Sequence, residues 1–112
     1  MSEKQMLVFD IETNGLLYDV SEIHCIAIYD STKEKTFVFN NQGGECYPIT
    51  EGLHWLSSAD VLIGHNIIGY DLPVLRKTYP WFKFNGDVLD TLILSRMYHP
   101  NMMEIDKKRN IA

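Results

Sequence analysis

Residues 6–12 constrain the fold of this chain more than any other segment. They read Met-Leu-Val-Phe-Asp-Ile-Glu, so an extended strand here is apolar on both faces until its carboxyl end. Such a strand is typical of the centre of a sheet that is covered on both sides. Asp10 and Glu12 stand two residues apart and therefore share one face of the strand. The segment predicts a central strand that brings two carboxylates to one edge of a sheet.

The rest of the chain predicts further strands and helices around this one. Residues 22–30 and 35–40 are rich in β-branched and aromatic residues, and the turn-forming residues 31–34 between them predict a hairpin. Beyond residue 48, apolar stripes and start signals predict helices that alternate with strands. The strands are expected at residues 60–64 and near 88–89, and the helices are expected to begin at Thr50, at Asp71 and at Asp90 or Thr91, the last ending at Pro100.

This order of elements predicts one α/β domain over residues 1–112. A three-stranded meander followed by right-handed crossovers gives a mixed sheet with helices packed on its faces. The chain has 112 residues, of which 46% are hydrophobic, and this is enough for one core. The short helix from Thr50 is expected to turn Leu53 and Leu56 inward.

Composition and charge exclude some classes of protein. The formal net charge is −5, which argues against a non-specific binder of duplex nucleic acid, because such a protein needs a basic surface. No apolar run approaches the roughly 20 residues of a membrane span, and no secretory signal is visible. We therefore expect a protein of the reducing cytoplasm that has no membrane partner.

The two carboxylates of residues 10–12 carry the first chemical signal. Two like charges close together next to an apolar strand would raise each other's pKa or require a cation. Carboxylate oxygens suit Mg²⁺ or Mn²⁺. The alternative is a strand end in solvent, where Asp10 and Glu12 would need no partner.

A second signal lies in Asn66-Ile67-Ile68-Gly69-Tyr70-Asp71, between a predicted strand and a predicted helix. Asp71 can be a helix N-cap that accepts backbone N–H bonds. If residues 60–64 pair beside residues 6–12, however, Asp71 comes towards Asp10. Three carboxylates that converge from separate elements then indicate a cation site.

These segments resemble those of a known enzyme family. Asp10-Ile11-Glu12-Thr13-Asn14-Gly15-Leu16 resembles the first motif of the DEDD exonucleases, which have a ribonuclease H-like fold, and Asn66 to Asp71 resembles the second. Residues 23–30, 65–66 and 90–96 are similar to the exonuclease domain of family-A replicative polymerases from T-odd phages. The resemblance covers residues 7–106 and implies a ribonuclease H-like mixed sheet in the order 3-2-1-4-5, in a protein of a phage-infected bacterial cell.

The resemblance also implies roles for particular residues. Asp10 would bridge two Mg²⁺ or Mn²⁺ ions, Glu12 would bind one of them, and Asp71 would serve the other. Thr13 and Leu16 would touch the terminal nucleotide of a single-stranded DNA 3′ end, and Asn66 would position the substrate backbone. Two alternatives remain open: Leu16 can be tucked into the core, and Asn66 can tie down its own loop.

The chain departs from the family in the third motif. The third motif of the family is a Tyr or His followed four or five residues later by an Asp, and no such pair is present. His99 and Glu104 have a similar spacing, but Pro100 breaks any helix between them. We therefore expect a domain that is incomplete at its C-terminus, with weak or no activity alone. Its partners would be the missing exonuclease segment or a polymerase domain.

Three accounts of the incomplete domain remain. The chain is a truncated exonuclease, one half of a split enzyme, or a module with the same fold that binds a single strand or a protein partner without cleaving DNA. The last account places the chain in a different functional class from the first two.

Overall fold

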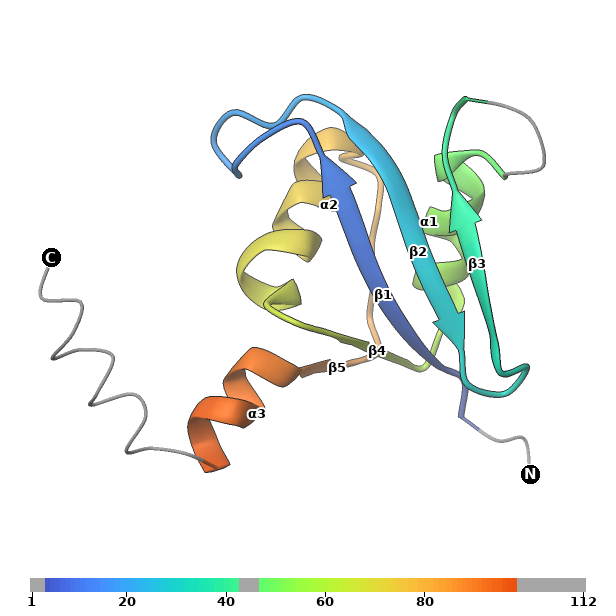
Figure 1. Ribbon diagram of the computed structural model, residues 1–112, viewed down its shortest axis with the longest axis vertical. Coiled ribbons are helices and arrows are strands. Elements are labelled where there is room, and N and C mark those ends of the chain that lie inside the picture. The colour runs from blue at the N-terminus through green and yellow to red at the C-terminus, as the bar shows by residue number, and fades with distance from the viewer. Residues whose placement is uncertain (1–3, 43–46, 99–112) are drawn as a thin grey trace, which may run out of the picture.

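A strand with Asp10 and Glu12 at its carboxyl end lies in the middle of a five-stranded mixed sheet (Figure 1). The structure is a computed structural model that describes residues 4–42 and 47–98. The strand order is β3-β2-β1-β4-β5, as predicted. The strands are β1 (Met6–Thr13), β2 (Ile23–Asp30), β3 (Lys35–Phe39), β4 (Val61–Gly64) and β5 (Asp87–Asp90), and the helices are α1 (Ile49–Ser58), the π-helix η1 (Ile67–Asp71), α2 (Leu72–Thr78) and α3 (Thr91–Tyr98).

The pairing of the strands follows from the lengths of their connections. β1 pairs with β2, and β2 with β3, in the antiparallel sense that short turns allow. β4 and β5 run parallel to β1, because helices return the chain to the same end of the sheet. The predicted hairpin between β2 and β3 is confirmed. In its turn, the buried carboxylate of Asp30 accepts the N–H groups of Thr32 (2.9 Å) and Lys33 (3.3 Å).

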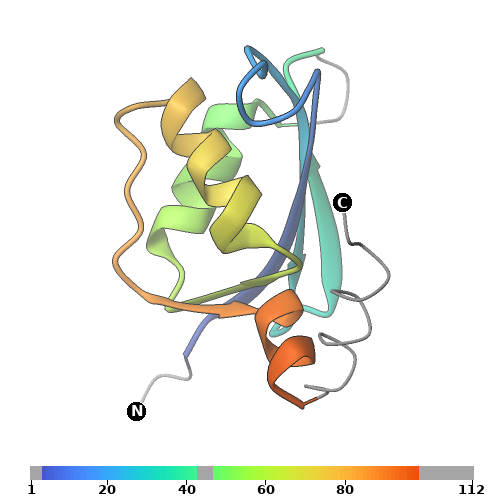
Figure 2. The ribbon, with the colours of Figure 1, turned by 90° about the vertical axis from the view of Figure 1, so that its left-hand side faces the viewer.

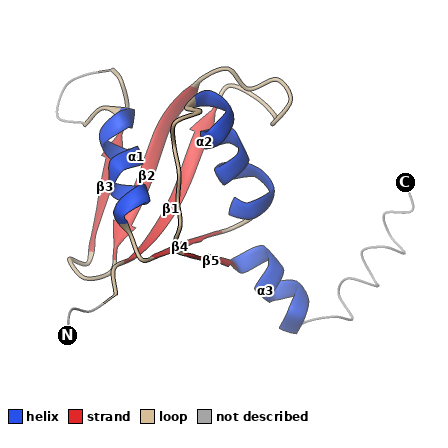
Figure 3. Ribbon diagram, turned by 180° about the vertical axis from the view of Figure 1, so that it is seen from behind, coloured by secondary structure: helices blue, strands red, loops and turns tan. Residues whose placement is uncertain are grey.

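Helices α1 and α2 lie against the same face of the sheet (Figures 2 and 3). The alternate residues of β1 that point to this face are buried, and they pack with the inward residues of both helices. The centre of this core comprises Leu7, Ile26, Ile28, Phe39, Ile49, Leu53, Leu56, Leu62, Ile67, Val74 and Leu75. The inward orientation predicted for Leu53 and Leu56 is thus confirmed.

The start of α1 differs from the prediction. The helix begins at Ile49, its N-cap position is Pro48, and no side chain caps it there, so the predicted cap at Thr50 is wrong. The reason lies in a distant residue, because the side-chain oxygen of Asn41 accepts the N–H of Ile49 (3.0 Å). A donor of the first helical turn is satisfied in this way by a residue that follows β3.

The other face of the sheet is open in the described part of the chain. One row of side chains crosses all five strands on this face, and the residues in register are Leu89, Ile63, Val8, Tyr29 and Thr36. Val8, Tyr29 and Leu89 are about 40% exposed. The expectation that β1 is covered on both sides is therefore met on one face only within residues 4–42 and 47–98. An apolar pattern shows that a strand is stabilised by burial of both faces, but it does not show that both faces are buried.

Helix α3 continues from β5 at the edge of the sheet and does not join the layer of α1 and α2 (Figure 3). Its apolar residues Ile93 and Met97 are 43% and 70% exposed. Asp90 accepts the N–H of Leu92 (2.9 Å), which confirms Asp90 as the cap. His99, Pro100 and Glu104 lie outside the described residues. Within the described ranges, no helix is long and apolar enough to cross a membrane.

Candidate functional site

The carboxyl end of β1 presents Asp10 and Glu12 on the open face of the sheet. Their burial alternates with that of Phe9 and Ile11, which point to the helices, so the predicted shared face is confirmed. Directly after Glu12 the register with β2 shifts, because Glu12 pairs with Cys25 and Thr13 with Ile23. Such a bulge ends regular pairing and redirects the following side chains.

Asp71 approaches β1 from the side of β4, whereas the bulge lies on the side of β2. β4 pairs with β1 only at Met6–Val8, so the N–H of Ile11 lies beyond the end of the parallel ladder. The carboxylate of Asp71 accepts this N–H (3.3 Å). The alternative of Asp71 as an N-cap is not realised, because its backbone is already helical and its side chain makes no cap bond.

The electrostatics of the site couple Asp71 to Asp10. Burial and the negative charge of Asp10 raise the pKa of Asp71 to about 7, although the N–H of Ile11 acts in the opposite direction. Asp71 is only 4% exposed. A buried carboxylate next to a second carboxylate is the chemical setting in which a divalent cation is stabilising, and an all-oxygen set of donors fits a hard ion such as Mg²⁺ or Mn²⁺.

Glu12 affects the pKa of Cys25, the residue opposite it on β2. Burial raises the pKa of the Cys25 thiol, and the charge of Glu12 raises it further. Cys25 is half-buried and lies on the open face, opposite Glu12. Within residues 4–42 and 47–98, no group of three His, Cys, Asp or Glu side chains is close enough to hold a metal ion. Of the predicted ligands, Asp71 lies close enough to Asp10 for the charge of Asp10 to raise the Asp71 pKa, and Glu12 stands two residues after Asp10 on β1.

The loop that follows β1 is held from the helix side. The hydroxyl of Tyr70 donates to the carbonyl oxygen of Gly15 (2.6 Å) and shares a hydrogen bond with Thr13 Oγ1 (2.6 Å). Lys77 Nζ donates to the carbonyl oxygens of Leu17 (2.9 Å) and Tyr18 (3.0 Å). Sequence reasoning missed both anchoring residues, and the position of Tyr70 directly before Asp71 was the one available signal for it.

This anchored loop exposes two large apolar side chains. Leu16 is 73% exposed and Tyr18 is 91% exposed. The alternative in which Leu16 is tucked into the core is therefore excluded. An apolar side chain that is held in water next to a pair of carboxylates is available to a ligand.

Asn66 lies where β4 turns into η1. Its backbone is left-handed (φ 60°), and its N–H is donated to a carboxylate oxygen of Asp90 (2.9 Å). Its own side chain is exposed and makes no hydrogen bond within the described residues, so that side chain does not tie down the loop there. The neighbouring His65 shares a hydrogen bond with Thr91 (3.0 Å), which joins the end of β4 to the start of α3.

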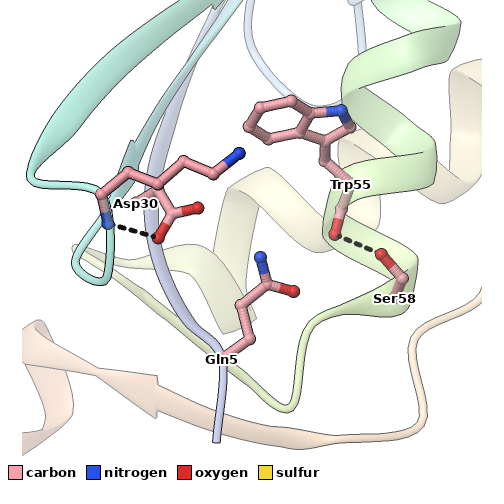
Figure 4. A pocket seen from close by; sticks show the side chains of 5 residues that line it. Gln5, Asp30, Trp55 and Ser58 are labelled. Atoms are coloured by element: carbon pink, nitrogen blue, oxygen red, sulfur yellow. Dashed lines mark hydrogen bonds between the residues drawn. The ribbon is translucent and has the colours of Figure 1, made fainter. Parts of the chain in front are cut away.

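Two hollows lie on the surface. One, of about 190 Å³, is on the open face and is lined by Val8, Phe9, Asp10, Ala27, Tyr29 and Thr36. The other, of about 150 Å³, lies at the opposite end of β1 between Gln5, Asp30, Lys33, Trp55 and Ser58 (Figure 4). Two polar groups of the second hollow form hydrogen bonds within their own segments. Asp30 accepts an N–H of its turn, and the Ser58 hydroxyl donates to the Trp55 carbonyl oxygen (3.1 Å). The first hollow adjoins the carboxylate site.

The sheet order and the carboxylates at the end of its central strand agree with a family model. The model of the RNase H superfamily matches residues 7–107. The chain belongs to the RNase H superfamily. Membership supports a nuclease-type function at a coarse level and agrees with the resemblance found from the motifs.

Relatives of this RNase H superfamily chain include DNA-directed DNA polymerases from Escherichia phage T7 and Enterobacteria phage T3. They are 33% and 31% identical over 109 residues, which is 90% of the chain but 15% of each relative. A solved family B DNA polymerase from the archaeon Pyrobaculum calidifontis has a similar fold, with a TM-score of 0.53 and 22% identity over 70% of this chain and 11% of that one. The chain thus matches a small part of much longer proteins.

Proposed function

We propose that the chain is the amino-terminal part of a 3′→5′ exonuclease domain of the proofreading kind. It hydrolyses the terminal phosphodiester of single-stranded DNA together with a segment that completes the domain. The observation that carries this proposal is the buried carboxylate of Asp71 facing Asp10, with its pKa raised to about 7 by burial and by that neighbour. The polymerases that are similar to the chain point to DNA as the substrate.

The carboxylates are the proposed ligands of the catalytic ions. Mg²⁺ or Mn²⁺ held by Asp10, Glu12 and Asp71 would neutralise these side chains and stabilise negative charge on the scissile phosphate. The N–H of Ile11 keeps the Asp71 carboxylate directed at β1 (3.3 Å). The bulge after Glu12 shifts the register, so that Thr13 pairs with Ile23. The bond to Ile11 holds one proposed ligand in place before an ion arrives, which is what a catalytic ion site requires.

The loop after β1 is the proposed seat of the 3′-terminal nucleotide. Leu16 is exposed beside the carboxylates and would pack against the terminal base. Thr13 and Asn66 would contact the sugar and the backbone of the strand. The anchors from Tyr70 and Lys77 support this role, because a contact surface on a fixed loop loses less entropy on binding than one on a free loop.

The open face of the sheet supports the proposal that a further segment completes the domain. Val8, Tyr29 and Val38 lie on this face and are 39%, 39% and 42% exposed. Asp10 borders the hollow there, so a segment that packs on the face would end next to the ion ligands. The chain spans 15% of the length of its phage relatives, which is consistent with such a segment or a polymerase domain as its partner in an infected cell.

One observation favours a second candidate function. Because the described residues provide no group of three metal-ligating side chains, the chain alone can be a module that binds single strands without cleaving them. In that case its affinity for a 3′ end would survive Asp10→Ala, whereas an exonuclease would lose cleavage.

The test is a cleavage assay with a 3′-labelled single-stranded oligonucleotide in Mg²⁺. We would compare the chain alone with the chain fused to the segment that follows the matched region in the phage T7 relative. We expect release of mononucleotides from the fusion at a rate at least 100-fold above that of the chain alone, on the order expected when catalytic groups act as a unit. Asp71→Asn should abolish the release, and Asp87→Asn, at an exposed position, should not. A fusion that binds 3′ ends with and without Asp10→Ala but never cleaves would overturn the exonuclease in favour of the binding module.

A further inference from the structure

The turn that delivers Asp71 has an unusual backbone. After β4 the chain passes through left-handed Asn66 (φ 60°) and then forms the π-helix Ile67–Asp71. Only glycine fits at Gly64, whereas a side chain at Gly69 would require the exposed Asn66 side chain to move. A Cβ on Gly64 would lie 2.3 Å from Ile67 Cγ2, and a Cβ on Gly69 would lie 2.6 Å from Asn66 Oδ1. A short π-helix supplies few internal hydrogen bonds, so outside groups must hold this conformation.

Asp90 supplies that outside support. Its carboxylate accepts the N–H of Asn66 (2.9 Å) with one oxygen and the N–H of Ile68 (3.0 Å) with the other. Asp90 is in register with Gly64 on the neighbouring strand, is 4% exposed, and faces the helix side of the sheet. A third N–H, from Leu92 at the start of α3, completes its set (2.9 Å).

The charge state of Asp90 is fixed by these donors. Burial disfavours the carboxylate, but the N–H groups of Ile68, Asn66 and Leu92 outweigh burial and lower the pKa of Asp90 below its ordinary value. These donors therefore favour the charged form of the Asp90 side chain, which lies between the end of β4, the π-helix and α3. Hydrogen bonds to a charged acceptor are the strongest kind available to a backbone N–H group.

Asp71 lies three positions after Ile68, so an anchor on the first turn of η1 determines where η1 ends. We propose that Asp90 is a positioning residue that holds the Asn66–Asp71 turn in its π-helical form and thereby places the Asp71 carboxylate against the N–H of Ile11 and next to Asp10. Asp90 touches neither substrate nor ion in this scheme. Its catalytic consequence rests on the proposed function, whereas the positioning itself does not.

A simpler role would be that Asp90 only caps α3. The two roles differ in their effect on Ile11, whose amide is 79 positions away from Asp90 in the chain and bonds to Asp71. If Asp90 positions Asp71, its loss reaches Ile11 through η1. If Asp90 is only a cap, its loss affects Leu92 and the start of α3.

The test is amide hydrogen exchange of the ion-free chain, followed by NMR. In Asp90→Asn we expect exchange at Asn66, Ile68 and Ile11 to accelerate about tenfold or more, as for lost bonds to a charged acceptor, with the centres of β1 and β2 unchanged. Asp60→Asn is the matched control. It removes a carboxylate that accepts the N–H of Gln5 (2.7 Å) at the other end of the β1–β4 pair, and it should leave Ile11 unaffected.

A second variant keeps the test decisive if Asp90→Asn fails to fold. Leu92→Pro removes the third donor and leaves the N–H groups of Asn66 and Ile68 in place; it lies in the first turn of α3, where an N–H has no intrahelical partner and proline is tolerated. Protection of Ile11 should then stay at the level of the parent chain. Loss of Ile11 protection in Leu92→Pro, or its retention in a folded Asp90→Asn variant, would overturn the positioning role. Neither measurement involves DNA, so a chain without nuclease activity can still show the positioning, and failure of one proposal is distinguishable from failure of the other.

Discussion

At the level of single residues, Asp71 makes the ion-free protein sensitive to pH. Its pKa is raised from an ordinary value of 3.8 to about 7 in the folded chain. Between these values the folded chain keeps a proton that the unfolded chain releases, so stability falls as pH rises through this window. Each unit of pKa difference corresponds to about 1.4 kcal/mol, which sets an upper bound of about 4 kcal/mol for the destabilisation at pH 8.

We therefore predict that Asp71→Asn stabilises the ion-free protein at pH 8 and stabilises it less at pH 5, because pH 5 lies near the lower end of this window. The amide has no proton to lose and can still accept the N–H of Ile11 through its oxygen. Thermal unfolding in chelator should show a midpoint several degrees higher for the variant at pH 8, given about 4–8 °C per kcal/mol for a domain of this size. The control Asp87→Asn should change the unfolding midpoint by the same amount at both pH values. An equal shift at pH 5 and pH 8 for Asp71→Asn would show that the buried charge is not the cause.

At the level of elements, β4 and η1 approach each other so closely that no side chain fits at Gly64. We predict that Gly64→Ala destabilises the chain by about 1–3 kcal/mol, because its Cβ would meet Ile67 Cγ2 at 2.3 Å and the carbonyl oxygen of Phe9 at 2.9 Å. Gly15→Ala is the control, since its nearest contact is an ordinary 3.5 Å to Asp19 Cβ. Chemical denaturation measures both variants. Equal stability of the two would contradict the tight approach.

The anchored loop after β1 gives a second prediction at this scale. Tyr70→Phe removes hydrogen bonds to Gly15 and Thr13, so we expect a loss of about 1 kcal/mol in stability and weaker binding of a 3′ end by several-fold. Tyr29→Phe is the control, because the Tyr29 hydroxyl has no hydrogen-bond partner within the described residues. Fluorescence anisotropy with a short labelled oligonucleotide reports the binding. Unchanged affinity in Tyr70→Phe would separate the loop from substrate recognition.

Local sequence patterns predicted the elements but not the contacts that lock them. The apolar run of β1 and the turn residues after β2 are local signals, and each predicted its element correctly. The cap of α1 comes from Asn41 and the support of η1 comes from Asp90, which are brought near only by tertiary folding. No spacing of residues in the sequence predicts a contact of that kind. Asp71 was predicted near Asp10 because strand topology, not local pattern, implied it.

For the molecule as a whole, the proposal that a further segment completes the domain concerns the open face of the sheet. We predict that Val38→Lys leaves the isolated chain folded, since Val38 is 42% exposed, but prevents the added segment from restoring cleavage. A lysine at Ser57, on the helix side, is the matched control and should permit restoration. The readouts are thermal unfolding of the chain alone and mononucleotide release by the fusion. Full restoration in Val38→Lys would show that the segment docks elsewhere.

The central claim is that Asp10 and Asp71 together hold a divalent ion. The most direct measurement is a titration of the chain with Mn²⁺ in which electron paramagnetic resonance counts the free ion. The account predicts binding by the parent chain and by Asp87→Asn, and a loss of about tenfold or more in affinity for Asp10→Ala and for Asp71→Asn, because each removes a charged ligand. Identical Mn²⁺ binding by the parent chain and Asp10→Ala would contradict it.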